Sequence, residues 1–201
     1  MLISNVGGTR IGDVARDAVA KTWEIEPQFV QSTRAAGGIR NSYAEPAQLG
    51  VDRWLAMIGS RSLEQGAICV VSVGTAMTID GIDAGGRHLG GVIVPGPDLM
   101  VSSLLHNTSD IAQRARRGTT SGRVFADNTL GAIRQGAEHA LAALIERSVH
   151  AMRDELGEAP HLLLTGGACE RVERAIGLTY RIVPDLVLRG LAALATGSEA
   201  K

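Results

Sequence analysis

The chain has few aromatic residues and no excess of basic ones. Only 3 % of its 201 residues are Phe, Trp or Tyr, and 20 Lys and Arg stand against 21 Asp and Glu, for a formal net charge of −1. Nucleic-acid binding usually requires a basic surface and, for single strands, aromatic side chains on which bases stack. The composition therefore argues against a nucleic-acid partner.

Cysteine is also scarce. Cys69 and Cys169 stand alone, without a Cys-x-x-Cys or Cys/His pattern that has metal-ligand spacing. We expect free thiols in a reducing cytoplasm. No apolar run approaches the roughly 20 residues that a membrane span requires. These absences favour a cytoplasmic protein without a membrane partner, whose 201 residues can bury one sizeable core or two small ones.

Residues 70–96 carry the most informative pattern in the chain. Short runs that are apolar, β-branched or alternating predict three strands, at residues 69–73, 78–82 and 89–94. Gly74 follows the first strand directly, where a glycine lets the backbone approach a ligand closely, and Thr75 offers a hydroxyl and an N–H to an anion. The pair suits a phosphate, although an ordinary hairpin explains these two residues alone more simply.

The rest of the chain predicts helices that alternate with short strands, and therefore an α/β protein. Strands are expected at residues 2–6, 28–31, 161–164 and 180–183, helices at 11–23, 46–58, 97–105, 129–156, 168–176 and 184–196, and polar loops at 33–42 and 107–123. Asn128 and Gly157 are typical of a helix N-cap and C-cap. Gly166 and Gly167 join a strand to an expected helix, a common way to place a helix N-terminus near a nucleotide.

Asp52 and Arg53 stand side by side in the helix expected at residues 46–58. Neighbouring residues on a helix point about 100° apart, so they do not pair as residues four apart would. They suit one polar ligand that is approached from two sides. The simpler interpretation is a solvated helix face, with the stem of Arg53 lying along Trp54.

Several motifs in order resemble the type III pantothenate kinases, including their Bvg accessory factor branch. The central ones are Val-Gly-Thr-Ala-Met-Thr-Ile-Asp at 73–80, Gly-Gly-Val-Ile-Val-Pro-Gly at 90–96, and Tyr43 followed by Pro-Ala-Gln-Leu-Gly-Val-Asp-Arg-Trp at 46–54. The match continues through Asn-Thr at 128–129, Leu-Thr-Gly-Gly at 164–167 and Pro-Asp-Leu-Val-Leu-Arg-Gly-Leu at 184–191. It covers essentially the whole chain.

The resemblance implies the fold of the acetate and sugar kinase, Hsp70 and actin superfamily, in which two ribonuclease H-like lobes enclose ATP. We expect a partial N-terminal lobe at residues 1–64 and a complete C-terminal lobe at residues 65–201. The implied reaction is ATP-dependent phosphorylation of pantothenate to 4′-phosphopantothenate, the first step of coenzyme A synthesis. The implied enzyme is a homodimer that uses ATP with Mg²⁺ and a monovalent cation, K⁺ or NH₄⁺.

The resemblance also implies roles for residues of the substrate site. Asp52 matches the general base, which takes the proton from the primary hydroxyl of pantothenate. The residues that would line the pantothenate pocket are Tyr43, Gly50, Val51, Asp52, Arg53 and Thr129. Arg53 is a natural partner for the substrate carboxylate.

For the nucleotide, the resemblance places Gly74 and Thr75 at the ATP phosphates and Gly166 and Gly167 beside the adenosine. The five histidines match no family position, so we expect them to be surface or packing residues.

Two departures from the family pattern matter. The family's Asp-x-Gly-Asn-Thr-x-x-Lys phosphate loop does not occur near Met1. We therefore expect an N-terminally truncated member, and a catalytically impaired homologue that binds pantothenate or regulates stays open as the alternative. Ser72 stands where the family carries an Asp that is linked with the activating cation, and a hydroxyl is a weaker ligand than a carboxylate for a hard cation.

Overall fold

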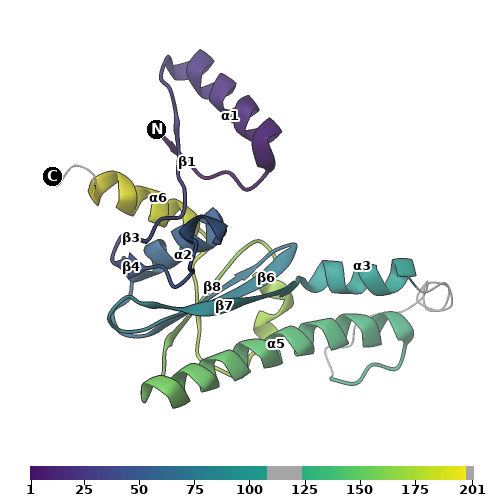
Figure 1. Ribbon diagram of the computed structural model, residues 1–201. Helices are drawn as coiled ribbons and strands as arrows, with labels where there is room; N and C mark the ends of the chain where they lie inside the picture. Colours follow the sequence, from purple (N-terminus) through teal and green to yellow (C-terminus); the bar gives the residue numbers. More distant parts are fainter. Residues whose placement is uncertain (108–123, 198–201) are drawn as a thin grey trace. The chain divides into compact units, whose positions relative to one another are not determined.

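The computed structural model describes residues 1–107 and 124–197, and it divides into two compact units. Unit 1 consists of Met1–Ile68, Asp80–Gly90 and Asp185–Lys201, and unit 2 of Cys69–Ile79 and Gly91–Pro184 (Figure 1). The lobe boundary expected between residues 64 and 65 stays a prediction. The polar loop expected at residues 107–123 lies, apart from its first residue, outside the described residues.

The chain contains a five-stranded sheet with the strand order β7-β6-β5-β8-β9 (Figure 1). Its strands are β5 (Ile68–Val73), β6 (Ala76–Ile82), β7 (His88–Pro95), β8 (His161–Thr165) and β9 (Arg181–Ile182). β8 and β9 are parallel, with Leu163 opposite Arg181. The strands predicted within residues 69–94 all form, because short β-branched runs interrupted by glycine turns leave few alternatives.

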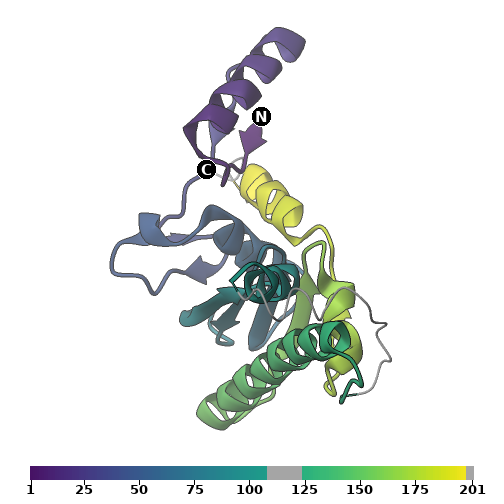
Figure 2. The same cartoon turned by 90° about the vertical axis from the view of Figure 1, so that its right-hand side faces the viewer.

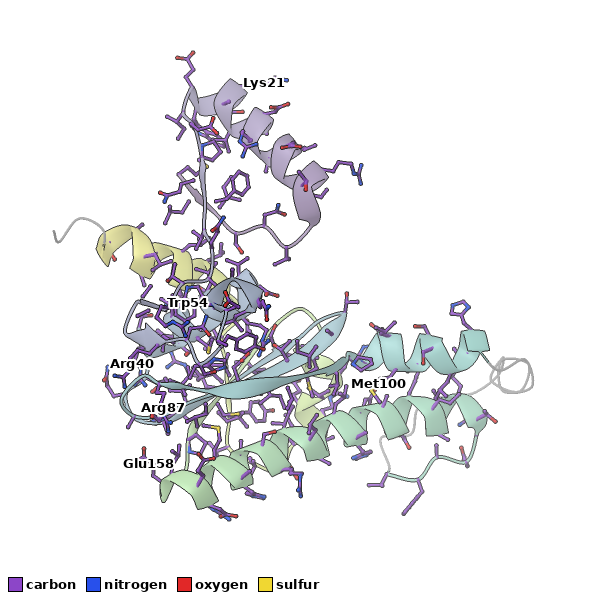
Figure 3. The ribbon with its side chains drawn as sticks, in the orientation of Figure 1. Lys21, Arg40, Trp54, Arg87, Met100 and Glu158 are labelled. Atoms are coloured by element: carbon purple, nitrogen blue, oxygen red, sulfur yellow. The ribbon has the colours of Figure 1, made fainter. Side chains whose placement is uncertain are left out.

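Unit 1 holds the remaining short strands and two helices that pack together. Its further elements are β1 (Leu2–Ile3), α1 (Gly8–Trp23), β2 (Gln28–Phe29), β3 (Ala35–Ala36), β4 (Ile39–Arg40), the 3₁₀ turn η1 (Pro46–Gln48), α2 (Val51–Arg61) and α6 (Leu186–Gly197). α2 lies beside α6, as both views show (Figures 1 and 2). A Cβ on Gly190 would meet the carbonyl oxygen of Leu55, so the glycine permits this close approach. Trp54 of α2, which Figure 3 labels, is fully buried.

Two expectations for this unit were wrong. The helix expected at residues 46–58 is interrupted, since Leu49 and Gly50 have extended ψ angles of 127° and 132°, and α2 therefore begins only at Val51. The loop expected at residues 33–42 contains the antiparallel pair β3 and β4. Its turn uses Gly37 and Gly38 at φ 55° and 78°, values that glycine adopts readily.

Unit 2 contains a long helix with both predicted caps. Its further elements are α3 (Pro97–Asn107), α5 (Thr129–Leu156) and the 3₁₀ turns η2 (Cys169–Arg171) and η3 (Glu173–Ala175). The Asn128 side chain accepts a hydrogen bond from the Gly131 N–H at 2.8 Å, and Gly157 ends α5 in the left-handed region at φ 76°. α3 runs beside the N-terminal part of α5 (Figures 1 and 2). The helix predicted at residues 168–176 was wrong, because two 3₁₀ turns occupy this segment.

Within residues 1–107 and 124–197, no helix combines the length and the apolar character that crossing a membrane would require.

Candidate active site

Asp52 lies in the first turn of α2 with its side chain exposed. Its Oδ1 accepts a hydrogen bond from the backbone N–H of Arg53 at 2.8 Å, and a carboxylate at this end of a helix is favoured by the helix dipole. A Cβ on Gly50 would lie 2.8 Å from Oδ1, so the glycine leaves room for the carboxylate. Val51, the first residue of α2, is half-buried. In the predicted base, Oδ1 is thus hydrogen-bonded to the backbone, while the side chain as a whole is exposed to solvent.

Arg53 is turned inward, unlike Asp52, and only 5 % of its side chain is exposed. Nε donates to Asp80 Oδ2 at 2.9 Å, Nη2 donates to Asp80 Oδ1 at 2.6 Å, and Nη1 donates to the Tyr43 hydroxyl at 3.1 Å. Burial alone lowers the pKa of Arg53, but the hydrogen bonds and charge of Asp80 raise this pKa above its ordinary value. Arg53 is a fixed cation that keeps two of its five N–H groups for other partners.

Tyr43 is half-buried and is held at both its ring and its backbone. Its ring stacks on that of His88, with centroids 6.0 Å apart and planes at 15°, and Arg53 Cζ lies 5.8 Å from the ring centre. The Tyr43 carbonyl accepts from Arg34 Nη1 at 2.7 Å, and its N–H donates to Asn41 Oδ1 at 3.0 Å. These contacts define the position of Tyr43 before any ligand binds.

Two residues of this cluster were missed by the sequence prediction. Asp80 is 2 % exposed and His88 is 1 % exposed, and His88 Nε2 lies 2.9 Å from Asp80 Oδ1. Asp80 belongs to the matched motif at residues 73–80, although the resemblance implies no role for it. An aspartate between Ile79 and Gly81 in a buried strand is itself a signal, because a buried carboxylate requires partners. We call Tyr43, Arg53, Asp80 and His88 the Asp80 network.

In unit 2, the exposed Gly74–Thr75 turn joins β5 to β6. The Gly74 N–H donates to the Ala76 carbonyl at 3.0 Å, and the Gly96 N–H donates to the Thr75 carbonyl at 2.8 Å. A Cβ on Gly96 would meet the Gly74 carbonyl oxygen. The backbone that precedes α3 therefore supports this turn directly.

The Gly166–Gly167 turn also lies against the end of β5. Gly166 has φ 98°, and a Cβ there would meet the Val73 carbonyl oxygen, which accepts from the Ala168 N–H at 3.0 Å. The structure thus brings together, within unit 2, the two turns that the sequence assigned to ATP.

The fold does not itself require a glycine at position 74 or 167. Neither has a positive φ, and a Cβ would lie 3.8 Å from the Ala76 oxygen at Gly74 and have no neighbour within 4 Å at Gly167. Both residues are exposed. The missing side chains leave this backbone open to a ligand.

Thr129 and Ser72 lie in other parts of unit 2. Thr129 is the first residue of α5 and lines a largely apolar groove of about 610 Å³. Met100 of α3, which Figure 3 labels, lines the same groove. Ser72 is half-buried in β5. Among the described residues, no group of three or more His, Cys, Asp or Glu side chains is placed to hold a metal ion. The hydroxyl of Ser72 does not fit a cation that depends on a carboxylate at this position.

Comparison with known proteins identifies the family. The sequence profile of "Type III pantothenate kinase" matches residues 1–151. A protein of that name from Azoarcus sp. (strain BH72) is 42 % identical over 200 residues, which cover 100 % of this chain and 73 % of the relative. Another, from Nitrosococcus oceani, is 36 % identical over 200 residues, which cover 97 % of this chain and 74 % of the relative.

One solved structure has a similar fold. A conserved protein from Campylobacter jejuni, named a Baf family transcriptional activator, superimposes with a TM-score of 0.59 at 22 % identity, covering 94 % of this chain and 80 % of that one. At this identity the likeness concerns the fold alone. The predicted α/β fold is confirmed. The chain belongs to the type III pantothenate kinase family.

Proposed function

We propose that the chain catalyses the ATP-dependent phosphorylation of pantothenate to 4′-phosphopantothenate, the first step of coenzyme A synthesis, in the cytoplasm. Its relatives at 36 % and 42 % identity are named type III pantothenate kinases. The observation that carries the proposal is the exposed Asp52 carboxylate in the first turn of α2, next to an Arg53 that is fixed to Tyr43.

In the proposed reaction, Asp52 accepts the proton of the primary hydroxyl of pantothenate while that oxygen attacks the γ-phosphorus. The bond between the γ-phosphorus and the β,γ-bridging oxygen breaks, and ADP leaves with the electron pair. Phosphoryl transfer depends mainly on positioning and on charge stabilisation, so an exposed carboxylate suffices as the base. The pantothenate pocket beside Asp52 would also be lined by Tyr43, Gly50, Val51 and Arg53.

We assign the nucleotide to the turns of unit 2. The exposed backbone at Gly74 and Thr75 would face the phosphates, and that at Gly166 and Gly167 would face the adenosine. The support is the absence of any steric need for glycine at two of these positions, 74 and 167, because such backbone can approach a ligand closely. Mg²⁺ would arrive with ATP and neutralise the charge of its phosphates.

Ser72 bears on the monovalent cation that the family resemblance implies. Ser72 offers a neutral hydroxyl where the family carries a carboxylate, so we propose that K⁺ or NH₄⁺ changes the rate little. Turnover measured in K⁺, NH₄⁺ and a bulky organic cation tests this. A Ser72→Asp variant that gains dependence on K⁺ would support the assignment of the position.

We also propose a homodimer, with the groove between α3 and α5 covered by a second copy. Leu99 and Leu104 of α3 are each 43 % exposed, and Leu104 lines the groove with Thr129. Apolar surface of this kind is often covered by a partner. Light scattering of the wild type and of Leu104→Glu tests the proposal, which predicts that the variant dissociates.

The proposed activity is tested by ATP-dependent phosphorylation of pantothenate, followed by mass spectrometry of the product. Asp52→Asn should reduce kcat by roughly 100-fold or more, as loss of a positioned base does. Asp13→Asn, which changes an exposed acid of α1, should leave kcat unchanged. Pantothenate binding without turnover would favour the alternative of a binding homologue, and absence of both would refute the proposal.

A further inference from the structure

The Asp80 network contains a buried carboxylate that accepts three hydrogen bonds. Oδ2 accepts from Arg53 Nε, and Oδ1 accepts from Arg53 Nη2 and faces His88 Nε2 at 2.9 Å. Because an ionised carboxylate only accepts, Nε2 of His88 carries the hydrogen of that contact. Asp80 therefore determines the orientation of both Arg53 and His88.

His88 in turn is held on its other side. Its Nδ1 lies 3.1 Å from the hydroxyl of Ser42, which donates to Nδ1 when the imidazole is neutral. With both ring nitrogens engaged, the imidazole plane has little freedom to rotate. That plane is the surface on which the Tyr43 ring stacks.

Two residues of the network contact Tyr43, each at a different part of its side chain. Its hydroxyl accepts from Arg53 Nη1 at 3.1 Å, and its ring face lies against His88. Both neighbours are hydrogen-bonded to Asp80, which is itself only 2 % exposed. Asp80 thus acts on the half-buried Tyr43 only through Arg53 and His88.

We propose that Asp80 and His88 are positioning residues for the acceptor substrate, which hold Tyr43 and the two remaining N–H groups of Arg53 in place for it. The inference rests on the proposed function for the identity of that substrate. It predicts that damage to the network raises KM for pantothenate, while KM for ATP, which the proposal places on unit 2, stays the same. A role in folding alone would not separate the two KM values.

The first test is steady-state kinetics of Asp80→Asn, which keeps the shape and removes the charge. KM for pantothenate should rise by roughly tenfold or more, because a bidentate charged contact is lost, with KM for ATP within about twofold. Asp83→Asn is the matched control. Asp83 directly follows β6, the strand that carries Asp80, but it pairs with Arg87 and lies outside the Asp80 network. It should leave both KM values unchanged. Equal rises in both KM values for Asp80→Asn would overturn the inference.

A second variant covers the case in which Asp80→Asn does not fold. His88→Gln keeps a donor for Asp80 and removes the ring on which Tyr43 stacks, so it should raise KM for pantothenate in the same selective way. Combined with Tyr43→Leu, which removes the other ring of the same stacked pair, its effect should fall well short of the sum of the two single effects, since both act through one contact. Additive effects would contradict the proposal.

A third measurement does not depend on activity. The chain has two tyrosines, so ¹³C-labelled tyrosine gives two sets of ring signals in NMR, and Tyr180→Phe assigns them. His88→Gln and Asp80→Asn should shift or broaden the Tyr43 signals, whereas Asp83→Asn should not. If these signals move but the wild type does not phosphorylate pantothenate, the proposed function fails while the positioning role stands. Unmoved signals would refute the positioning role directly.

Discussion

Arg53 and Asp80, which are 27 positions apart in the sequence, form a two-point ion pair with Nη2–Oδ1 at 2.6 Å and Nε–Oδ2 at 2.9 Å. Their side chains are only 5 % and 3 % exposed. Burying two charges is costly, and further hydrogen bonds to Tyr43 and His88 offset part of that cost. Each of the two buried charges is therefore stabilised mainly by the opposite charge of its partner.

Removing one residue of the Arg53–Asp80 pair should lower the free energy of unfolding far more than replacing both by apolar residues. Asp80→Ala leaves the Arg53 cation buried without its counter-charge, and we expect the free energy of unfolding to fall by about 3–5 kcal/mol. The double variant Arg53→Met, Asp80→Leu should recover much of that loss, because it buries no charge. Urea unfolding measures both. Asp13→Ala, which breaks an exposed pair with Arg16, is the control and should change little. A double variant as unstable as Asp80→Ala would contradict this account.

The sequence predicted the parts of the fold that local chemistry determines. The N-cap at Asn128 and the left-handed Gly157 bound α5 as expected, because both caps act within a few residues. The pair β3 and β4 was missed although Gly37-Gly38 is a known two-residue hairpin signal. The helix predicted after Gly167 failed because that segment forms only short 3₁₀ turns, which apolar periodicity does not distinguish from a helix.

The motifs predict which residues belong to the site, but not how these residues are buried or paired. Asp52 and Arg53 were singled out as neighbours, but nothing in their spacing indicates that one faces solvent and the other is buried. That difference follows from the start of α2 at Val51 and from the position of Asp80 on β6. His88, expected as a surface or packing residue, is buried against Asp80, a contact that only the pairing of distant segments creates.

Gly50 should be needed for the placement of Asp52 and not for stability. Its φ of −55° suits any residue, but a Cβ would lie 2.8 Å from Asp52 Oδ1 and would displace the carboxylate. We expect Gly50→Ala to reduce kcat by roughly tenfold, the cost of a misplaced catalytic group, with the free energy of unfolding changed by less than about 1 kcal/mol. Steady-state kinetics and urea unfolding check this. An unchanged kcat would show that the carboxylate has room to move without loss.

Cys169 should make the protein less stable in alkali. Burial is the main cause that raises the pKa of this thiol from 9.0 to about 11, and its Sγ donates to the Thr165 carbonyl at 2.9 Å. As the pH rises from 9 towards 11, the unfolded chain loses the proton that the folded protein still holds, so the free energy of unfolding falls. The loss should reach about 2–3 kcal/mol. Urea unfolding at several pH values should show this component in the wild type and not in Cys169→Ala, and parallel pH profiles would contradict it.

Gly190 should be essential for the contact between α2 and α6. A Cβ there would meet the carbonyl oxygen of Leu55, and because backbone cannot rotate away as a side chain can, α2 would have to shift. We expect Gly190→Ala to lower the free energy of unfolding by about 1–3 kcal/mol, as overpacking does, and to reduce kcat as well because α2 carries Asp52. Gly197→Ala, at the end of the same helix and with no atom within 4 Å of its Cβ, is the matched control and should be close to neutral. If both variants unfolded at the same urea concentration, the two helices would have to pack less closely than the structure places them.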